Sequence, residues 1–296
     1  MCRTLNLAVR NSFLRNAGLL TLLFLWTVPT ILFAAEKISV ALTVHDSLTS
    51  PNQPATIEAT LIGKSLLTET PLGGEPIELL VAGNVVATAM TGGDGRALLS
   101  YIPKAKGSVP FTVRLGAASK ISVAEASANL AVWERRSPIM AVEMVSLIED
   151  LTGQGPTVTA PGKEAVGRRS MPNAAEELGK LTQFYYNVLY VVTQDTVGDS
   201  KDQVNAQTRR WLMDQKFPVG HIVVVPSGPE AFGAKLDELH AAGWKTLKIG
   251  VGSTKAFAEA FLQRRLDAVM VPEPDKGEAP RKAKVAKEWK DVRKKM

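Results

Sequence analysis

The sequence is poor in the residues that most often bind metals or form covalent cross-links. Its 296 residues include a single cysteine, Cys2, so the rest of the chain can form neither a disulfide nor a thiolate metal site. The three histidines, His45, His221 and His240, lie far apart and lack a metal-ligand spacing, so we expect structural roles for them. The chain also has no internal repeat. These absences exclude a disulfide-stapled body and a site built from cysteine and histidine ligands.

The middle of the chain has no net positive charge, which is instead concentrated at the two ends. The net charge is +6, but residues 281–296 alone hold eight Lys/Arg and only two acids. Arg3, Arg10 and Arg15 add positive charge at the other end, so the region between is slightly acidic. We therefore expect no nucleic-acid partner for the body of the protein.

An apolar, uncharged stretch at residues 17–35 follows the N-terminal arginines. This order predicts a signal peptide in residues 1–35. Because a run of about 19 apolar residues is nearly long enough to span a bilayer, an N-terminal anchor in the inner membrane is the alternative. In both cases the rule that positive charge stays on the cytoplasmic side predicts a periplasmic or secreted body.

Residues 38–133 have the pattern of an all-β domain. Residues 38–44 alternate between apolar and polar side chains, as a half-buried strand does. Further short strands are expected at residues 55–61, 77–81, 85–90, 97–102, 109–115 and 127–133. Glycine-rich turns such as Gly92-Gly93 separate them. About seven short strands with regular turns predict a β-sandwich.

Three motifs in this domain are similar to those of bacterial immunoglobulin-like (Ig-like) domains. They are the strand entry at residues 74–83, the turn at residues 91–96 and the aromatic strand end Tyr101-Ile-Pro103. The resemblance implies a spacer or adhesive module without chemistry of its own. Residues 133–138 form a polar connector, and Pro138 marks its end.

From Ile139 on, apolar strands alternate with amphipathic helices. Strands are expected at residues 139–148, 188–192, 222–225, 246–251 and 268–271. Helices are expected at residues 173–183, 199–216, 232–242 and 254–264. Continuous apolar strands between helices predict a parallel sheet covered on both faces, and hence a second, α/β domain at residues 139–275. Residues 276–296 would follow as a basic helix or tail.

The first strand of this second domain leads into the motif Ile148-Glu149-Asp150-Leu151-Thr152. With residues 189–193, 208–212, 217–224 and 248–258, this motif resembles the haloacid dehalogenase (HAD) superfamily, most closely the lipin-type (LNS2-like) phosphatidate phosphatase domain and its bacterial relatives. The resemblance covers about 135 residues and implies a Rossmann-like, three-layer fold.

The resemblance also assigns roles to individual residues. Asp150 matches the general acid/base, Thr152 a residue that shapes its turn, and Thr193 the hydroxyl that binds the phosphoryl group. Lys235 matches the lysine beside the phosphate, with Lys245 as the alternative.

The family's nucleophile and metal ligands are missing from the matching positions. Ile148 occupies the nucleophile position, and Gly252-Ser253-Thr254-Lys255 replaces the late acids. Since Mg²⁺ needs hard oxygen ligands, we expect no metal, no cofactor and a non-catalytic domain. If Glu149 or Asp150 takes the place of the nucleophile, the domain would instead be a Mg²⁺-dependent phosphatase.

Two further segments are candidates for binding. Arg168 and Arg169, in the long loop after the motif, could bind a phosphate-bearing ligand together with Ser253. The alternatives are a surface loop and a hydroxyl that satisfies the local backbone. Residues 281–296 predict a basic helix with one apolar stripe, formed by Val285, Trp289, Val292 and Met296. Such a helix could lie on an anionic membrane, or its Trp289 could pack on its own domain.

Three functions follow from these patterns. The leading hypothesis is an exported envelope protein whose degenerate HAD-like domain serves ligand binding or assembly. The first alternative is an active phosphohydrolase acting on phosphatidate or a small phosphate ester. The second is a surface adhesion or scaffold protein.

Overall fold

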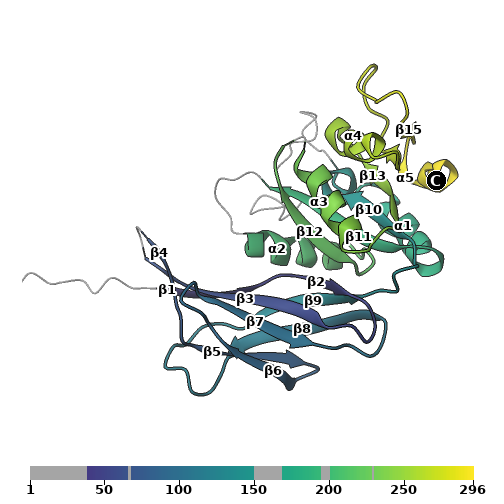
Figure 1. Ribbon diagram of the computed structural model, residues 1–296. Coiled ribbons are helices and arrows are strands. Elements are labelled where there is room, and N and C mark those ends of the chain that lie inside the picture. The colour runs from purple at the N-terminus through teal and green to yellow at the C-terminus, as the bar shows by residue number, and fades with distance from the viewer. Residues whose placement is uncertain (1–38, 66–67, 150–168, 195–200, 229) are drawn as a thin grey trace, which may run out of the picture. The chain divides into compact units, whose positions relative to one another are not determined.

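The computed structural model describes residues 39–65, 68–149, 169–194, 201–228 and 230–296 (Figure 1). The chain divides into residues Met1–Lys37 and a compact unit, Ile38–Met296. The expected signal peptide or anchor lies outside the described residues. Within the described residues, no helix is both long and apolar enough to cross a membrane.

Two sheets pack face to face as a β-sandwich. In one sheet, β3 (Ala55–Lys64) pairs antiparallel with β1 (Ser39–Val44), β4 (Glu69–Pro71) and β7 (Arg96–Tyr101). The other has the order β2-β9-β8-β5-β6. Its strands are β2 (Ser47–Thr49), β5 (Pro76–Val81), β6 (Asn84–Met90), β8 (Gly107–Leu115) and β9 (Ala126–Val132).

Alternating side chains build the core of the sandwich. In β3, Ile57, Ala59 and Leu61 are fully buried while the residues between them are at least partly exposed. They share one cluster with Leu79 of β5 and Leu130 of β9. The period-two pattern thus gives each sheet one buried face, as a sandwich requires.

A third sheet has six strands, all parallel, in the order β12-β11-β10-β13-β14-β15. The strands are β10 (Ile139–Glu143), β11 (Asn187–Gln194), β12 (His221–Pro226), β13 (Leu247–Gly252), β14 (Asp267–Met270) and β15 (Lys284–Val285). The helices are α1 (Ala174–Phe184), α2 (Lys201–Asp214), α3 (Ala231–Ala241), α4 (Lys255–Gln263) and α5 (Trp289–Lys295), with the 3₁₀ helix η1 (Met144–Leu147).

Helices cover both faces of this sheet. Met140 and Val142 of β10 point to one face, where their cluster includes residues of α1, α2 and α5. Ile139 and Ala141 point to the other face, where their cluster includes residues of α3 and α4 and also Trp133. Because both faces are buried, every position of β10 is buried.

The first strand of the parallel sheet is shorter than the sequence predicts. A strand is expected at residues 139–148, but β10 ends at Glu143, where the Ser146 hydroxyl donates a hydrogen bond to the Glu143 carbonyl and η1 begins. Ile148 instead forms an isolated antiparallel bridge with Ser170 and packs partly buried against the core. Ile148 and Glu149, the first two residues of the motif, therefore lie beyond the strand end and not on it.

Candidate functional site

The carboxyl ends of the two central strands meet at the side chain of Glu143. Strand order reverses between β10 and β13. In open α/β sheets, ligands bind in the crevice outside such a reversal. In this protein the Glu143 carboxylate lies there. One of its oxygens, Oε2, accepts hydrogen bonds from the backbone N–H groups of Ser253 (2.8 Å) and Thr254 (2.9 Å), and the other is bonded to the Thr254 hydroxyl.

The Glu143 carboxyl group lies at the start of α4, where an anion would bind. Thr254 caps this helix by accepting from the N–H of Phe257, and Glu143 binds N–H groups just before the helix begins. Burial raises the pKa of Glu143, and the hydrogen bonds from Thr254 and Ser253 oppose that rise. A Cβ on Gly252 would lie 2.6 Å from Glu143 Oε2, so a residue without a side chain lets the carboxylate approach. The protein's own carboxylate thus occupies the place that a bound anion takes at a helix N-terminus.

The predicted phosphate site lies only partly within the described residues. Asp150, Thr152 and Arg168 lie outside them. Thr193 and Ser253 lie at the carboxyl-end edge of the sheet, on either side of β10. The Ser253 N–H donates a hydrogen bond to Glu143 Oε2. The Ser253 Oγ is buried and has no hydrogen-bond partner among the described residues.

Two of the predicted cationic residues, Lys235 and Lys245, lie away from that edge. Lys235 pairs with Glu238 on α3 at 2.7 Å, and its charge acts on His221, the first residue of β12. Lys245 is exposed in the turn that precedes β13, and Arg169 is exposed at the base of the long loop. Among the described residues, no three His, Cys, Asp or Glu side chains lie close enough to hold a metal ion.

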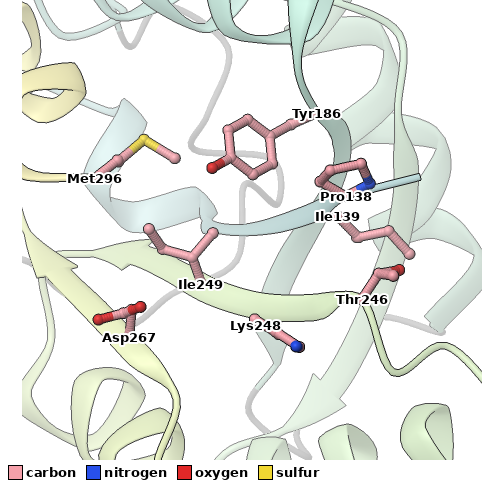
Figure 2. A pocket seen from close by; sticks show the side chains of 8 residues that line it. All are labelled: Pro138, Ile139, Tyr186, Thr246, Lys248, Ile249, Asp267 and Met296. Atoms are coloured by element: carbon pink, nitrogen blue, oxygen red, sulfur yellow. The ribbon is translucent and has the colours of Figure 1, made fainter. Parts of the chain in front are cut away.

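A small cavity of about 300 Å³ lies at the opposite, amino-end edge of the parallel sheet. Figure 2 shows Tyr186, Ile249 and Met296 around it. Its other lining residues are Pro138, Ile139, Thr246, Lys248 and Asp267. The volume is at the lower limit for a small-molecule site, and the charged Asp267 is engaged with Lys284 at 3.2 Å.

A buried ion pair joins the sandwich to the parallel sheet, and the sequence analysis missed it. Asp46, in the turn between β1 and β2, has a fully buried side chain and pairs with Arg209 of α2. It also accepts hydrogen bonds from the backbone N–H groups of Asn129 in β9 (2.9 Å) and Ile222 in β12 (3.1 Å). No local pattern marks this aspartate, because its partners are 83 to 176 residues away.

Aromatic rings extend this junction. The ring of Trp133 packs edge-on against His221 and Trp244, and the Arg135 guanidinium lies 4.1 Å from the centre of the Trp244 ring. Burial lowers the pKa of His221 to about 4, although the nearby Asp46 carboxylate favours the charged form. The connector predicted at residues 133–138 is therefore packed against the sheet at Trp133 and Arg135.

The sandwich exposes an apolar edge, which we call the β6–β7 edge and define by Val85, Val86, Met90, Leu98 and Ile102. These side chains are 46%, 39%, 60%, 63% and 55% exposed. β6 is the last strand of its sheet and β7 pairs with β3 alone among the described strands, while the two strands contact each other (Figure 1). The seven residues of β6 include no charged residue and no proline.

Natural edge strands are commonly protected from pairing by charge, proline or a bulge. Among these, β6 has only a bulge, opposite Leu79 and Leu80 of β5. No described strand pairs with its outer N–H and C=O groups, and apolar side chains lie beside them. Of the features described, this edge is the one best suited to bind another protein chain.

Comparisons with known proteins identify no family for the chain. No family model matches it, and no curated protein matches it either. An uncharacterized protein from Listeria monocytogenes serotype 4b is similar in structure at 15% identity and a TM-score of 0.39, covering 53% of this chain and 95% of that one.

Smaller all-β structures are also similar. The CARDB domain of the PF1109 protein from Pyrococcus furiosus covers 33% of this chain and 93% of its own, at 13% identity and a TM-score of 0.24. Fibronectin(III)-like modules of CbhA from Clostridium thermocellum cover 31% of this chain and 95% of their own, at 12% identity and a TM-score of 0.23. TM-scores this low carry no argument about function.

The assignment of residues 139–275 to a Rossmann-like HAD domain is wrong, although the parallel sheet that was predicted there is present. The similar solved structures include Ig-like, fibronectin-III-like and CARDB domains, and no HAD or Rossmann-like structure is among them. The physical reason is that the motif that suggested the family starts five residues after the end of β10, at Ile148. The degenerate HAD-like ligand-binding function and the phosphatase alternative were both inferred from this family. Because the family assignment is wrong, neither function is supported.

Proposed function

We propose that the chain is an extracytoplasmic surface adhesion or scaffold protein that binds its partner through the β6–β7 edge. The observation that carries the proposal is the uncharged edge strand β6, with Val85 and Met90 about half exposed or more. A partner strand added to β6 would pair with its outer backbone groups and cover these side chains. The extracytoplasmic location is supported by the N-terminal arginines and by the apolar run at residues 17–35.

Strand addition suits this edge for energetic reasons. Each hydrogen bond formed contributes only about 0.5–1.5 kcal/mol net, so affinity must come from several bonds along the strand together with apolar contact. The β6–β7 edge offers both, because exposed apolar side chains of β6 and β7 lie beside the unpaired backbone. The buried contacts of Asp46 and Trp133 hold the sandwich to the rest of the unit, so a bound partner is held by the whole unit.

The test is adhesion of protein-coated beads to cells of the producing organism. Val85→Lys with Met90→Lys places two charges on the edge and should reduce bead adhesion about ten-fold or more, because burying unpaired charge costs more than about 1.4 kcal/mol. The matched control is Ala117→Lys with Ala118→Lys, two exposed positions in a turn of the same sandwich. Equal adhesion by the edge variant and the control would refute the proposal.

A further inference from the structure

The C-terminal region presents a basic surface, defined by Arg281, Lys282, Lys287, Lys290, Arg293, Lys294 and Lys295. All seven side chains are exposed. Of these, only Lys294 forms an ion pair within the described residues, with Asp291 at 2.9 Å. The surface therefore carries a high density of positive charge that the protein itself leaves largely uncompensated.

The apolar side of this region is buried in the protein's own core. Trp289 is 1% exposed and donates a hydrogen bond from Nε1 to the Ser146 carbonyl at 3.0 Å, and Val292 is 0% exposed. The stripe predicted as one helix is divided, because Val285 belongs to β15 and α5 begins only at Trp289. The apolar stripe is thus unavailable for insertion into lipid, and α5 presents its charged side to the outside.

We propose that the basic surface docks the protein on an anionic phospholipid bilayer by charge alone, without insertion of apolar side chains. A bilayer is the favoured polyanion because the same chain has the apolar run at residues 17–35 after three arginines, a pattern that directs proteins to membranes. The region between the two basic ends is slightly acidic, so an anionic surface would attract α5 and repel the rest of the body.

The mechanism predicts a strong salt dependence. The Debye length shortens from about 10 Å at 0.1 M to about 3 Å at 1 M ionic strength, which weakens attraction between an exposed basic surface and lipid headgroups. Insertion of a tryptophan would be far less sensitive to salt, because apolar burial does not depend on charge.

The experiment is co-sedimentation of the full chain with vesicles. Phosphatidylcholine vesicles containing about one third phosphatidylglycerol are compared with pure phosphatidylcholine, which measures any charge-independent binding by residues 17–35. Lys282→Gln, Lys287→Gln and Lys290→Gln remove three charges that have no ion pair among the described residues, and all lie outside the last turn of α5. The matched control neutralises three exposed lysines outside the basic surface, Lys104, Lys120 and Lys245, which also have no ion pair among the described residues.

We expect the triple variant to bind the anionic vesicles at least about ten-fold more weakly, and the control to change less than about two-fold. Both variants should keep the wild-type unfolding midpoint. Equal losses in the two variants, or no preference for phosphatidylglycerol, would overturn the proposal. Tighter binding to duplex DNA than to the anionic vesicles would overturn the choice of a bilayer. None of these results bears on the β6–β7 edge, which is tested by bead adhesion.

Discussion

At the scale of single residues, the Glu143 side chain occupies the position at the sheet edge where a ligand would be expected. It ends the central strand β10 and accepts hydrogen bonds from the two residues that precede α4. An external anion would have to displace a carboxylate that already satisfies these donors. The crevice at the strand reversal is therefore part of the protein's own support for α4.

Substitution of Glu143 should separate hydrogen bonding from charge. Glu143→Ala leaves the N–H groups of Ser253 and Thr254 without their acceptor and should lower the free energy of unfolding by about 2–4 kcal/mol. Glu143→Gln keeps one oxygen for these N–H groups, and its amide can donate to the Thr254 hydroxyl, so it should cost less than about 1 kcal/mol. Urea unfolding of both variants measures this, and equal costs would contradict the assigned hydrogen bonds.

At the scale of elements, one buried aspartate connects parts of the chain that are remote in sequence. Asp46 receives hydrogen bonds from β9 and β12 and pairs with α2. Three elements from both parts of the fold thus converge on a single carboxylate. Removal of the Asp46 carboxylate should weaken the packing between all three elements. Removal of one donor leaves the other hydrogen bonds to Asp46 in place.

The junction predicts an order of stabilities for three variants. Asp46→Ala should destabilise by about 3–5 kcal/mol, because it leaves Arg209 and two backbone donors without an acceptor. Arg209→Ala should cost less, about 1–2 kcal/mol, since Asp46 keeps both backbone bonds. Arg210→Ala, at the adjacent exposed position of α2, should change stability by less than about 0.5 kcal/mol. Denaturant midpoints measure the order, and a reversed order would show that the junction is not centred on Asp46.

At the scale of the whole molecule, two buried groups give stability opposite dependences on pH. Burial raises the folded-state pKa of Glu143 above 4.5, so its contribution is fully present below pH 4.5 and is lost as pH rises through the raised value. Burial lowers the pKa of His221 from 6.5 to about 4, so its contribution is present above pH 6.5 and is lost as pH falls towards 4. The charged groups that act on His221 are Asp46, Lys235 and Arg209.

The histidine part of this dependence can be isolated by substitution. Between pH 6.5 and pH 4 the His221 contribution should fall by roughly 3 kcal/mol, because burial lowers its pKa from 6.5 to about 4. His221→Phe keeps a ring against Trp133 and removes this titration, so its loss of stability across that range should be smaller than that of the wild type. Unfolding free energies measured at both pH values give the difference. Parallel profiles for the two proteins would contradict the burial of a neutral His221.

Local periodicity was sufficient to locate many of the elements. Alternation placed a strand at residues 38–44, where β1 spans Ser39–Val44. Apolar runs placed strands at residues 188–192 and 222–225, inside β11 and β12. These signals are local because a strand with one or two buried faces repeats its side-chain pattern within a few residues. The same locality explains the wrong family assignment, since a short apolar-acidic motif looks alike on a strand end and beyond it.

The sequence by itself determined the alternation of strands and helices, the concentration of charge at the two ends and the apolar stripe of the C-terminal region. Only the tertiary structure decided where β10 ends, because Glu143 is held by backbone donors more than 100 residues away. It also decided which side of α5 is free, since Trp289 bonds to Ser146, 143 residues earlier. Ser253 was visible as a candidate, but Glu143 and Asp46 were not. Their roles depend on partners that no local pattern brings together.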